Sequence, residues 1–142
     1  MAKISSVKLD MDKVEKGVWH DYAEGIRLCI ASISNNEYKK ARDKLLASHL
    51  RQIRARTLTS DEVLDILKPA VAKHLLVNWS SIEDETGKTI PYSYEKALEF
   101  FNDPALSDFY SFVLDTAGEN SAYRQELIED AEKNLSNASS GI

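Results

Sequence analysis

Apolar and polar residues alternate along residues 5–32 with the period of two that is typical of β-strands. Val7 and Leu9, for example, each stand between polar or charged neighbours. Gly17 and Gly25 lie at the two points where such a chain would reverse its direction. The pattern predicts a small N-terminal antiparallel β-hairpin or a three-stranded meander.

Beyond residue 34 the apolar positions follow the three-and-four-residue spacing of a helix. One helix is predicted from Asn35 or Asn36 to about Arg56, with its apolar side at Tyr38, Ala41, Leu45, Leu46, Leu50 and Ile53. Residues Thr59–Glu62 form a capping box that opens a second helix. Its stripe consists of Val63, Ile66, Leu67, Ala70, Val71, His74, Leu75 and Val77. Pro69 lies inside this stripe and should kink or split the helix.

The last part of the chain predicts a loop followed by three shorter helices. The loop covers residues 79–92, and the helices are expected to end near Asn102, to run from Pro104 to Gly118, and to run from about Asn120 to Leu135. With 142 residues and 43% hydrophobic content, we expect one domain over residues 1–135 and a flexible tail over residues 136–142. The predicted fold class is mainly α within the α+β class: a helical domain with a small N-terminal sheet.

Several residues of the predicted loop region have clear local roles. Gly87 suits the positive φ of a tight turn, and Ser93 and Asp103 suit helix N-caps. Trp79 follows the apolar stripe and precedes the turn, so we expect it to be a core anchor that joins two layers.

The same region resembles the tail assembly chaperones of long-tailed phages. The likeness is good over roughly the last half of the chain. It rests on Trp79, Ile82, Asp84, Gly87, Ile90, Pro91, Ser93, Glu95, Pro104, Tyr123, Glu129, Lys133 and Asn134. The resemblance implies a protein that binds the tape measure protein, keeps it soluble, and helps to recruit major tail protein during assembly. It also implies action in the host cytoplasm, departure before the virion is mature, and no cofactor.

The residues themselves indicate no catalysis, metal site or cofactor site. The three histidines lack metal-ligand spacing, and His74 is expected to be a hydrogen-bonded core histidine. Cys29 stands alone between Leu28 and Ile30, so it is expected to be a small buried hydrophobe. No nucleophile is paired with a base, so we expect no enzyme. No apolar run is long enough to span a bilayer, and no secretion signal is expected.

Charge is unevenly divided along the chain. Residues 1–78 contain 14 Lys and Arg against 10 Asp and Glu, whereas residues 79–142 contain 4 against 13. On the predicted helix through Arg56, Lys40, Lys44, Arg51 and Arg54 fall within one strip of about 80°. This strip is the predicted protein-binding surface, and a solvated outer face is the alternative.

Two other functions remain open at this point. One is a small nucleic-acid-binding regulator that uses the basic helix over residues 39–56. The chain is acidic overall and no aromatic residues interleave with these bases, so nucleic acid is the less favoured partner. The other is a structural tail or connector subunit. A homo-oligomer is also compatible with the uneven charge.

Overall fold

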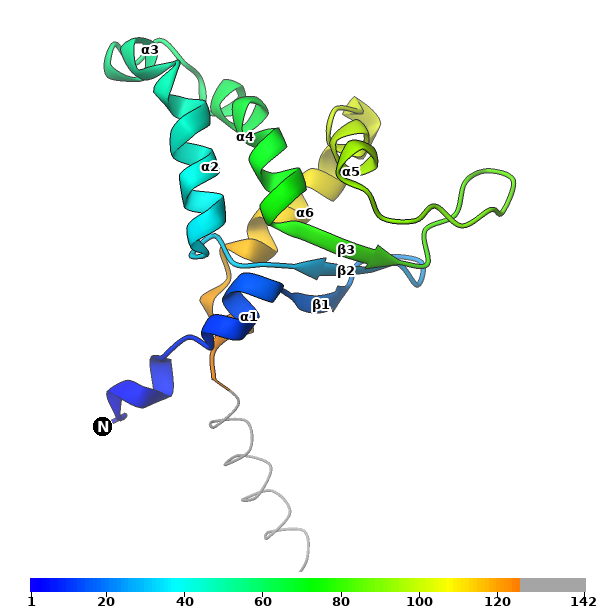
Figure 1. Ribbon diagram of the computed structural model, residues 1–142, viewed down its shortest axis with the longest axis horizontal. Coiled ribbons are helices and arrows are strands. Elements are labelled where there is room, and N and C mark those ends of the chain that lie inside the picture. Colours follow the sequence, from blue (N-terminus) through cyan, green and yellow to red (C-terminus); the bar gives the residue numbers. More distant parts are fainter. Residues whose placement is uncertain (126–142) are drawn as a thin grey trace, which may run out of the picture.

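The computed structural model describes residues 1–125 and joins a small sheet to a helical layer (Figure 1). The helices are α1 (Met11–Lys16), α2 (Asn36–Ala47), α3 (Leu50–Arg54), α4 (Ser60–His74), α5 (Tyr94–Phe101) and α6 (Ser107–Ala117). Short 3-10 turns are η1 (Ile4–Val7), η2 (Pro104–Leu106) and η3 (Asn120–Tyr123). The strands β1 (Val18–Asp21), β2 (Arg27–Ile30) and β3 (Leu76–Ser80) form an antiparallel sheet in the order β1-β2-β3. The predicted α+β class is confirmed.

The sheet differs from the predicted N-terminal meander in where its strands come from. The β1–β2 hairpin turns at Gly25, as expected, and Gly25 has a φ of +81°. The third strand is β3, which begins two residues after α4 and pairs with β2 through Leu28 and Trp79. The alternation at Val7 and Leu9 does not make a strand, because residues 4–7 form η1 and Val7 is 49% exposed.

The predicted helix to about Arg56 is broken into α2 and α3. The chain leaves α2 at Ala47, and the Ser48 hydroxyl donates to the Leu45 carbonyl at 3.1 Å. A local hydroxyl-to-backbone bond of this kind competes with continued helix. The helix therefore does not carry one continuous basic strip.

Other boundaries follow the predicted caps. Thr59 and Glu62 form the expected capping box of α4, and Ser93 and Asp103 each accept a backbone N–H at the start of the next helical segment. Of the kink or split expected at Pro69, the split is wrong, since α4 continues through Pro69 to His74. The apolar stripe beyond His74 is strand rather than helix.

The helix predicted from Asn120 begins instead as η3, after which Arg124 forms an isolated antiparallel bridge with Leu9. The Gln125 amide donates to the Lys8 carbonyl at 3.1 Å. The rest of that predicted helix and the predicted tail over residues 136–142 lie outside the described residues.

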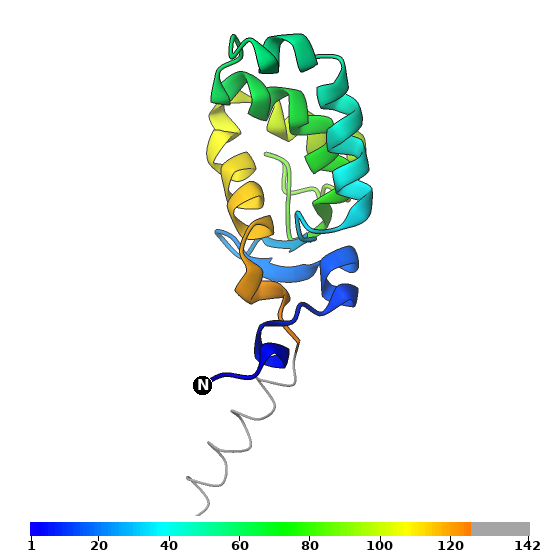
Figure 2. The same cartoon turned by 90° about the vertical axis from the view of Figure 1, so that its left-hand side faces the viewer.

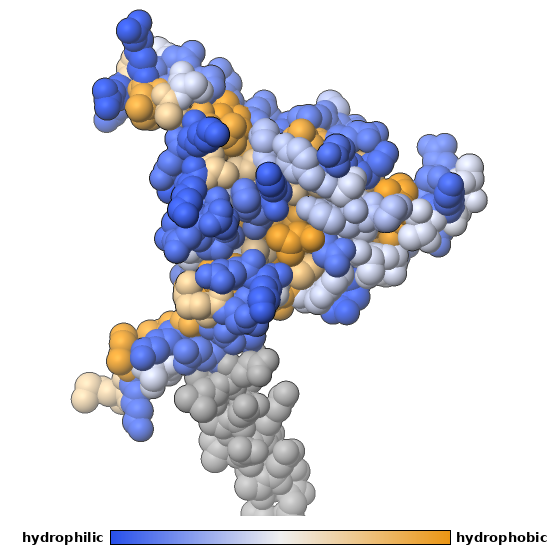
Figure 3. Space-filling view, in the orientation of Figure 1, coloured by the Kyte–Doolittle hydropathy of each residue, from blue (hydrophilic) through white to orange (hydrophobic). Residues whose placement is uncertain are grey.

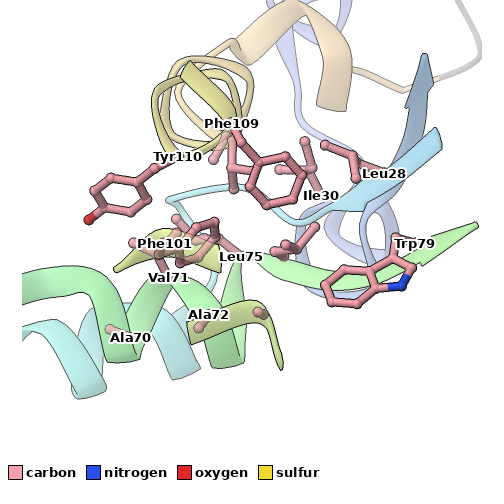
Figure 4. Packing of buried hydrophobic residues seen from close by; sticks show 14 of the residues in the cluster. Leu28, Ile30, Ala70, Val71, Ala72, Leu75, Trp79, Phe101, Phe109 and Tyr110 are labelled. Carbon is pink, nitrogen blue, oxygen red and sulfur yellow. The ribbon is translucent and has the colours of Figure 1, made fainter. Parts of the chain in front are cut away.

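The core lies between the sheet and the helices that stand on one side of it (Figures 1 and 2). Trp79 is 5% exposed, as predicted for a core anchor, and its indole N–H donates to the Ile90 carbonyl at 2.8 Å. Its ring stacks at 5.4 Å on Phe100, and Phe101 and Phe109 fill the space between α4 and α6 (Figure 4). The core joins the aromatic residues of α5 and α6 to α4 and the sheet.

Candidate partner-binding groove

Asn35 fixes the start of α2 against the end of α4. Its side-chain oxygen caps α2 by accepting from the Tyr38 amide at 2.7 Å. Its side-chain nitrogen donates to the Ser32 carbonyl at 2.7 Å and to the His74 carbonyl at 3.3 Å. Asn35 is 3% exposed, so these bonds are shielded from competing water. One cap residue therefore begins a helix and also holds two helices together.

Two tyrosines fix the opposite side of α4. The Tyr92 hydroxyl donates to the Ala72 and Leu76 carbonyls at 3.0 and 2.8 Å, and burial raises its pKa. The Tyr110 hydroxyl on α6 donates to the Leu64 carbonyl at 2.6 Å, and burial raises its pKa as well. That side of α4 is held by Tyr92, just before α5, and by α6, whereas its other side packs against α2, and the surface described next lies along the junction of α2 and α4.

A shallow hollow of about 400 Å³ lies along this surface. Its walls and floor come from α2, α4 and the first residue of α5, namely Ala41, Lys44, Leu45, Ser48, Pro69, Ala70, Lys73, His74 and Tyr94. A second hollow of about 350 Å³ shares Lys73 and His74 with the first and also includes Lys40. We refer to the two hollows together as the α2/α4 groove. Apolar surface is visible between α2 and α4, with hydrophilic side chains on both sides (Figure 3).

Three lysines lie along the edge of the groove. Lys40, Lys44 and Lys73 are all exposed. Lys40 lies 3.7 Å from Glu37 in an exposed pair, which holds it only weakly. Within residues 1–125 the first hollow has no carboxylate in its lining, and no ion pair is seen for Lys44 or Lys73. The first hollow thus combines an apolar floor with two lysines that have no ion-pair partner within the described part of the chain, whereas the second hollow is mostly polar and includes Glu15 and Glu37 beside Lys40 and Lys73.

His74 lies between the two hollows rather than in the core, so the prediction of a core histidine is wrong. Its side chain is partly buried. Burial is the main cause that lowers its pKa, and the neighbouring Lys73 lowers it further. The ring is therefore neutral at neutral pH and adds to the apolar floor rather than to the charge of the rim.

The structure divides the four predicted protein-binding residues between two places. Lys40 and Lys44 line the α2/α4 groove, whereas Arg51 and Arg54 lie on α3 and are exposed. Sequence reasoning missed Lys73 and His74, which come from the last turn of α4. Periodicity alone could not find them, because it does not say which helix packs beside which.

α3 forms a separate corner of the molecule, next to the start of α4 (Figures 1 and 2). Leu50 and Ile53 on α3 are 45% and 37% exposed, and neither packs against the main core cluster. Leu64 on α4 is 39% exposed. We call Leu50, Arg51, Ile53, Arg54 and Leu64 the α3 corner; it is a protrusion, unlike the groove.

Other candidate chemistry has a structural role. Cys29 is buried, as predicted, and burial raises the pKa of its thiol. Asp84 organises the Gly87 turn by accepting from the Thr86 hydroxyl at 2.6 Å and from the Lys88 amide at 3.0 Å, and these bonds lower its pKa. Among residues 1–125, no group of three or more His, Cys, Asp and Glu side chains is placed to hold a metal ion. In the same part of the chain, no helix is both long enough and apolar enough to cross a membrane.

Comparison with known proteins gives one family. Residues 33–134 match the sequence model of the family described as YdaY prophage protein. No curated protein and no solved structure matches the chain. The matched region starts just before α2 and contains every residue of the first hollow.

Proposed function

We propose, from the premise that the chain belongs to the YdaY prophage protein family, that this phage-derived protein acts as a tail assembly chaperone. In this proposal it binds the tape measure protein in the host cytoplasm, keeps it soluble, and helps to recruit major tail protein. It does so by binding rather than by catalysis, needs no cofactor, and leaves before the virion is mature. The resemblance of residues 79–134 to tail assembly chaperones supports the finer assignment.

The observation on which the proposal rests is the α2/α4 groove. An apolar floor between two helices, with lysines on the rim, suits an amphipathic helix whose apolar side is flanked by acidic residues. The apolar contacts would supply affinity, and the rim charges would mainly speed association and make it sensitive to salt. A long helical protein with an uncovered apolar side is the kind of client that such a groove can protect from aggregation.

The length of the groove indicates how such a chaperone would work. α2 has 12 residues and is therefore about 18 Å long at about 1.5 Å per residue. One copy can cover about three turns of a partner helix, at about 3.6 residues per turn. A long client would need many copies, and short individual contacts would allow major tail protein to displace them.

Co-expression with the tape measure protein of the same phage tests the function. We expect the tape measure protein to be soluble with the wild-type chain and insoluble without it. The variant Lys40→Glu/Lys44→Glu/Lys73→Glu, called here the groove-Glu variant, should lose much of this effect at low salt. If the tape measure protein stays equally insoluble with and without the wild-type chain, the chaperone function is wrong.

A matched control is available on the α3 corner. Arg51→Glu/Arg54→Glu also reverses basic charges, but outside the groove, and it should solubilise the tape measure protein as well as wild type does. An opposite result, in which the α3 variant fails and the groove-Glu variant succeeds, would keep the function and move the binding surface to α3.

The nucleic-acid alternative loses its main premise, since the helix over residues 39–56 is two helices with a break at Ser48 and His49. The groove-Glu variant and Arg51→Glu/Arg54→Glu separate nucleic-acid binding from the chaperone function. Retention of the wild-type chain on DNA that weakens steeply with salt would favour it.

A further inference from the structure

The sequence of residues 126–135, ELIEDAEKNL, complements the α2/α4 groove. Leu127, Ala131 and Leu135 recur at intervals of four, the spacing of one side of a helix. Four acidic residues accompany them, at positions 126, 129, 130 and 132. This combination of apolar and acidic residues complements the first hollow, which has an apolar floor with Lys44 and Lys73, unpaired within residues 1–125, at its edge and Lys40 in the adjoining hollow.

Both regions lie almost entirely in the part of the chain that the family model matches. The family match covers residues 33–134, so it includes α2, α4 and nearly all of the acidic segment, and it leaves out α1 and the β1–β2 hairpin. The two helices of the groove and residues 126–134 therefore lie within the region that the family model matches.

The described part of the chain ends away from the groove, at the point from which residues 126–135 continue. The Gln125 amide is bonded to the Lys8 carbonyl, and this end of the chain lies on the far side of α1 from α2 and α4 (Figures 1 and 2). The described part of the chain thus ends beside α1, while the groove floor begins at Ala41 and Leu45 on α2.

We propose that residues 126–135 of one copy occupy the α2/α4 groove of a second copy, and that two copies exchange these segments reciprocally. Reciprocal exchange gives a closed dimer with twofold symmetry, whereas a one-way contact would continue into an open chain. The dimer covers both grooves with segments of the chain itself. The self-association needs no phage partner, so it can be tested independently of the proposed function.

The experiment measures the molar mass of the purified full chain by light scattering during size exclusion, over a range of concentrations. Wild type, at 16.0 kDa per chain, should show a dimer that dissociates on dilution. The groove-Glu variant and the segment variant Glu129→Lys/Asp130→Lys/Glu132→Lys should each be monomeric. In a dimer formed by either variant alone, each groove would face a segment that carries charge of the same sign.

Mixing the two variants is the decisive step, because both contacts in the mixed pair again join opposite charges. The mixture should recover the mass of the wild-type dimer, a result that misfolding of either variant cannot produce. Arg51→Glu/Arg54→Glu serves as the control and should remain dimeric.

Three results would overturn the proposal. They are a wild-type chain that is monomeric at all concentrations, a groove-Glu variant that remains dimeric, and a mixture of the two monomeric variants that does not associate. Failure of tape measure solubilisation with an intact dimer would count against the proposed function alone.

Discussion

The α5–α6 side of α4 and the α2 side of α4 are built in opposite ways. On the first side, Trp79 and Tyr110 are buried and Tyr92 is partly buried, and the polar atom of each of these three side chains donates to a backbone carbonyl. On the second side, Lys44 and Lys73 stand at the edge of an apolar hollow with no ion pair inside the described part of the chain. The first arrangement stabilises the fold, and the second leaves groups free for a partner. One helix therefore separates the region that holds the protein together from the region that we expect to bind.

The largest effect should come from removing the aromatic anchor. Trp79→Ala removes a buried ring that stacks on Phe100 and leaves a cavity. Such a change typically lowers the free energy of unfolding by about 3–5 kcal/mol. Urea unfolding followed by circular dichroism measures the loss. Trp19→Ala is the matched control, because Trp19 is 38% exposed and its loss should cost far less. Equal losses in the two variants would show that Trp79 is not an anchor.

A smaller effect should follow from the residue that links the two regions. Asn35→Ala removes the cap of α2 and the bond to the His74 carbonyl, and loss of a cap costs about 0.5–2 kcal/mol. The neighbouring Asn36→Ala should be close to neutral, because Asn36 is exposed and is not the cap. Urea midpoints of the two variants, measured side by side, check the difference. A similar midpoint for both would contradict the role given to Asn35.

Stability should also depend on pH through two histidines. Burial lowers the pKa of His20 and of His74 below the ordinary value of 6.5. The unfolded chain then binds more protons than the folded chain just below 6.5, so the free energy of unfolding falls as the pH falls through that window. The urea midpoint should therefore be lower at about pH 5.5 than at about pH 7. His20→Asn/His74→Asn should flatten this difference, and an unchanged slope would assign it to other groups.

The smallest effect on stability should come from the α3 corner. Arg51 and Arg54 are exposed and pair with no carboxylate in residues 1–125, so Arg51→Glu/Arg54→Glu should change the free energy of unfolding by at most about 0.5 kcal/mol. Thermal unfolding by circular dichroism is sufficient to check this. A drop of several degrees would mean that α3 is part of the stable core after all.

Sequence reasoning predicted what depends on neighbouring residues in the chain. The Thr59–Glu62 capping box, the Ser93 and Asp103 caps, the Gly87 turn and the anchoring role of Trp79 were all predictable, because each is a local need for a hydrogen bond, a backbone angle or burial. The third strand was not, because β3 is defined by its pairing with β2 across more than forty intervening residues. The same limit explains why the sequence predicted only part of the groove. Lys40 and Lys44 lie on one predicted helix, whereas Lys73 joins them only because α4 packs beside α2.

The break between α2 and α3 shows where periodicity misleads. Leu50 and Ile53 continue the apolar spacing of Tyr38 and Leu45, yet they do not reach the core. The Ser48 hydroxyl bonds to the Leu45 carbonyl, and the backbone changes direction at His49, so Leu50 and Ile53 lie away from the core. The basic strip predicted across that break is therefore two surfaces, of which only one borders a groove.

Hydrogen exchange of the chain tests the central claim most directly, measured alone at a dilution at which the proposed dimer dissociates and in complex with the tape measure protein. Backbone amides of α2 from Lys40 to Ala47 and of α4 from Ala70 to His74 should exchange more slowly in the complex, while amides of α3 keep their rates. Protection confined to α3, or to α5 and α6, would contradict the claim that the α2/α4 groove is the binding surface.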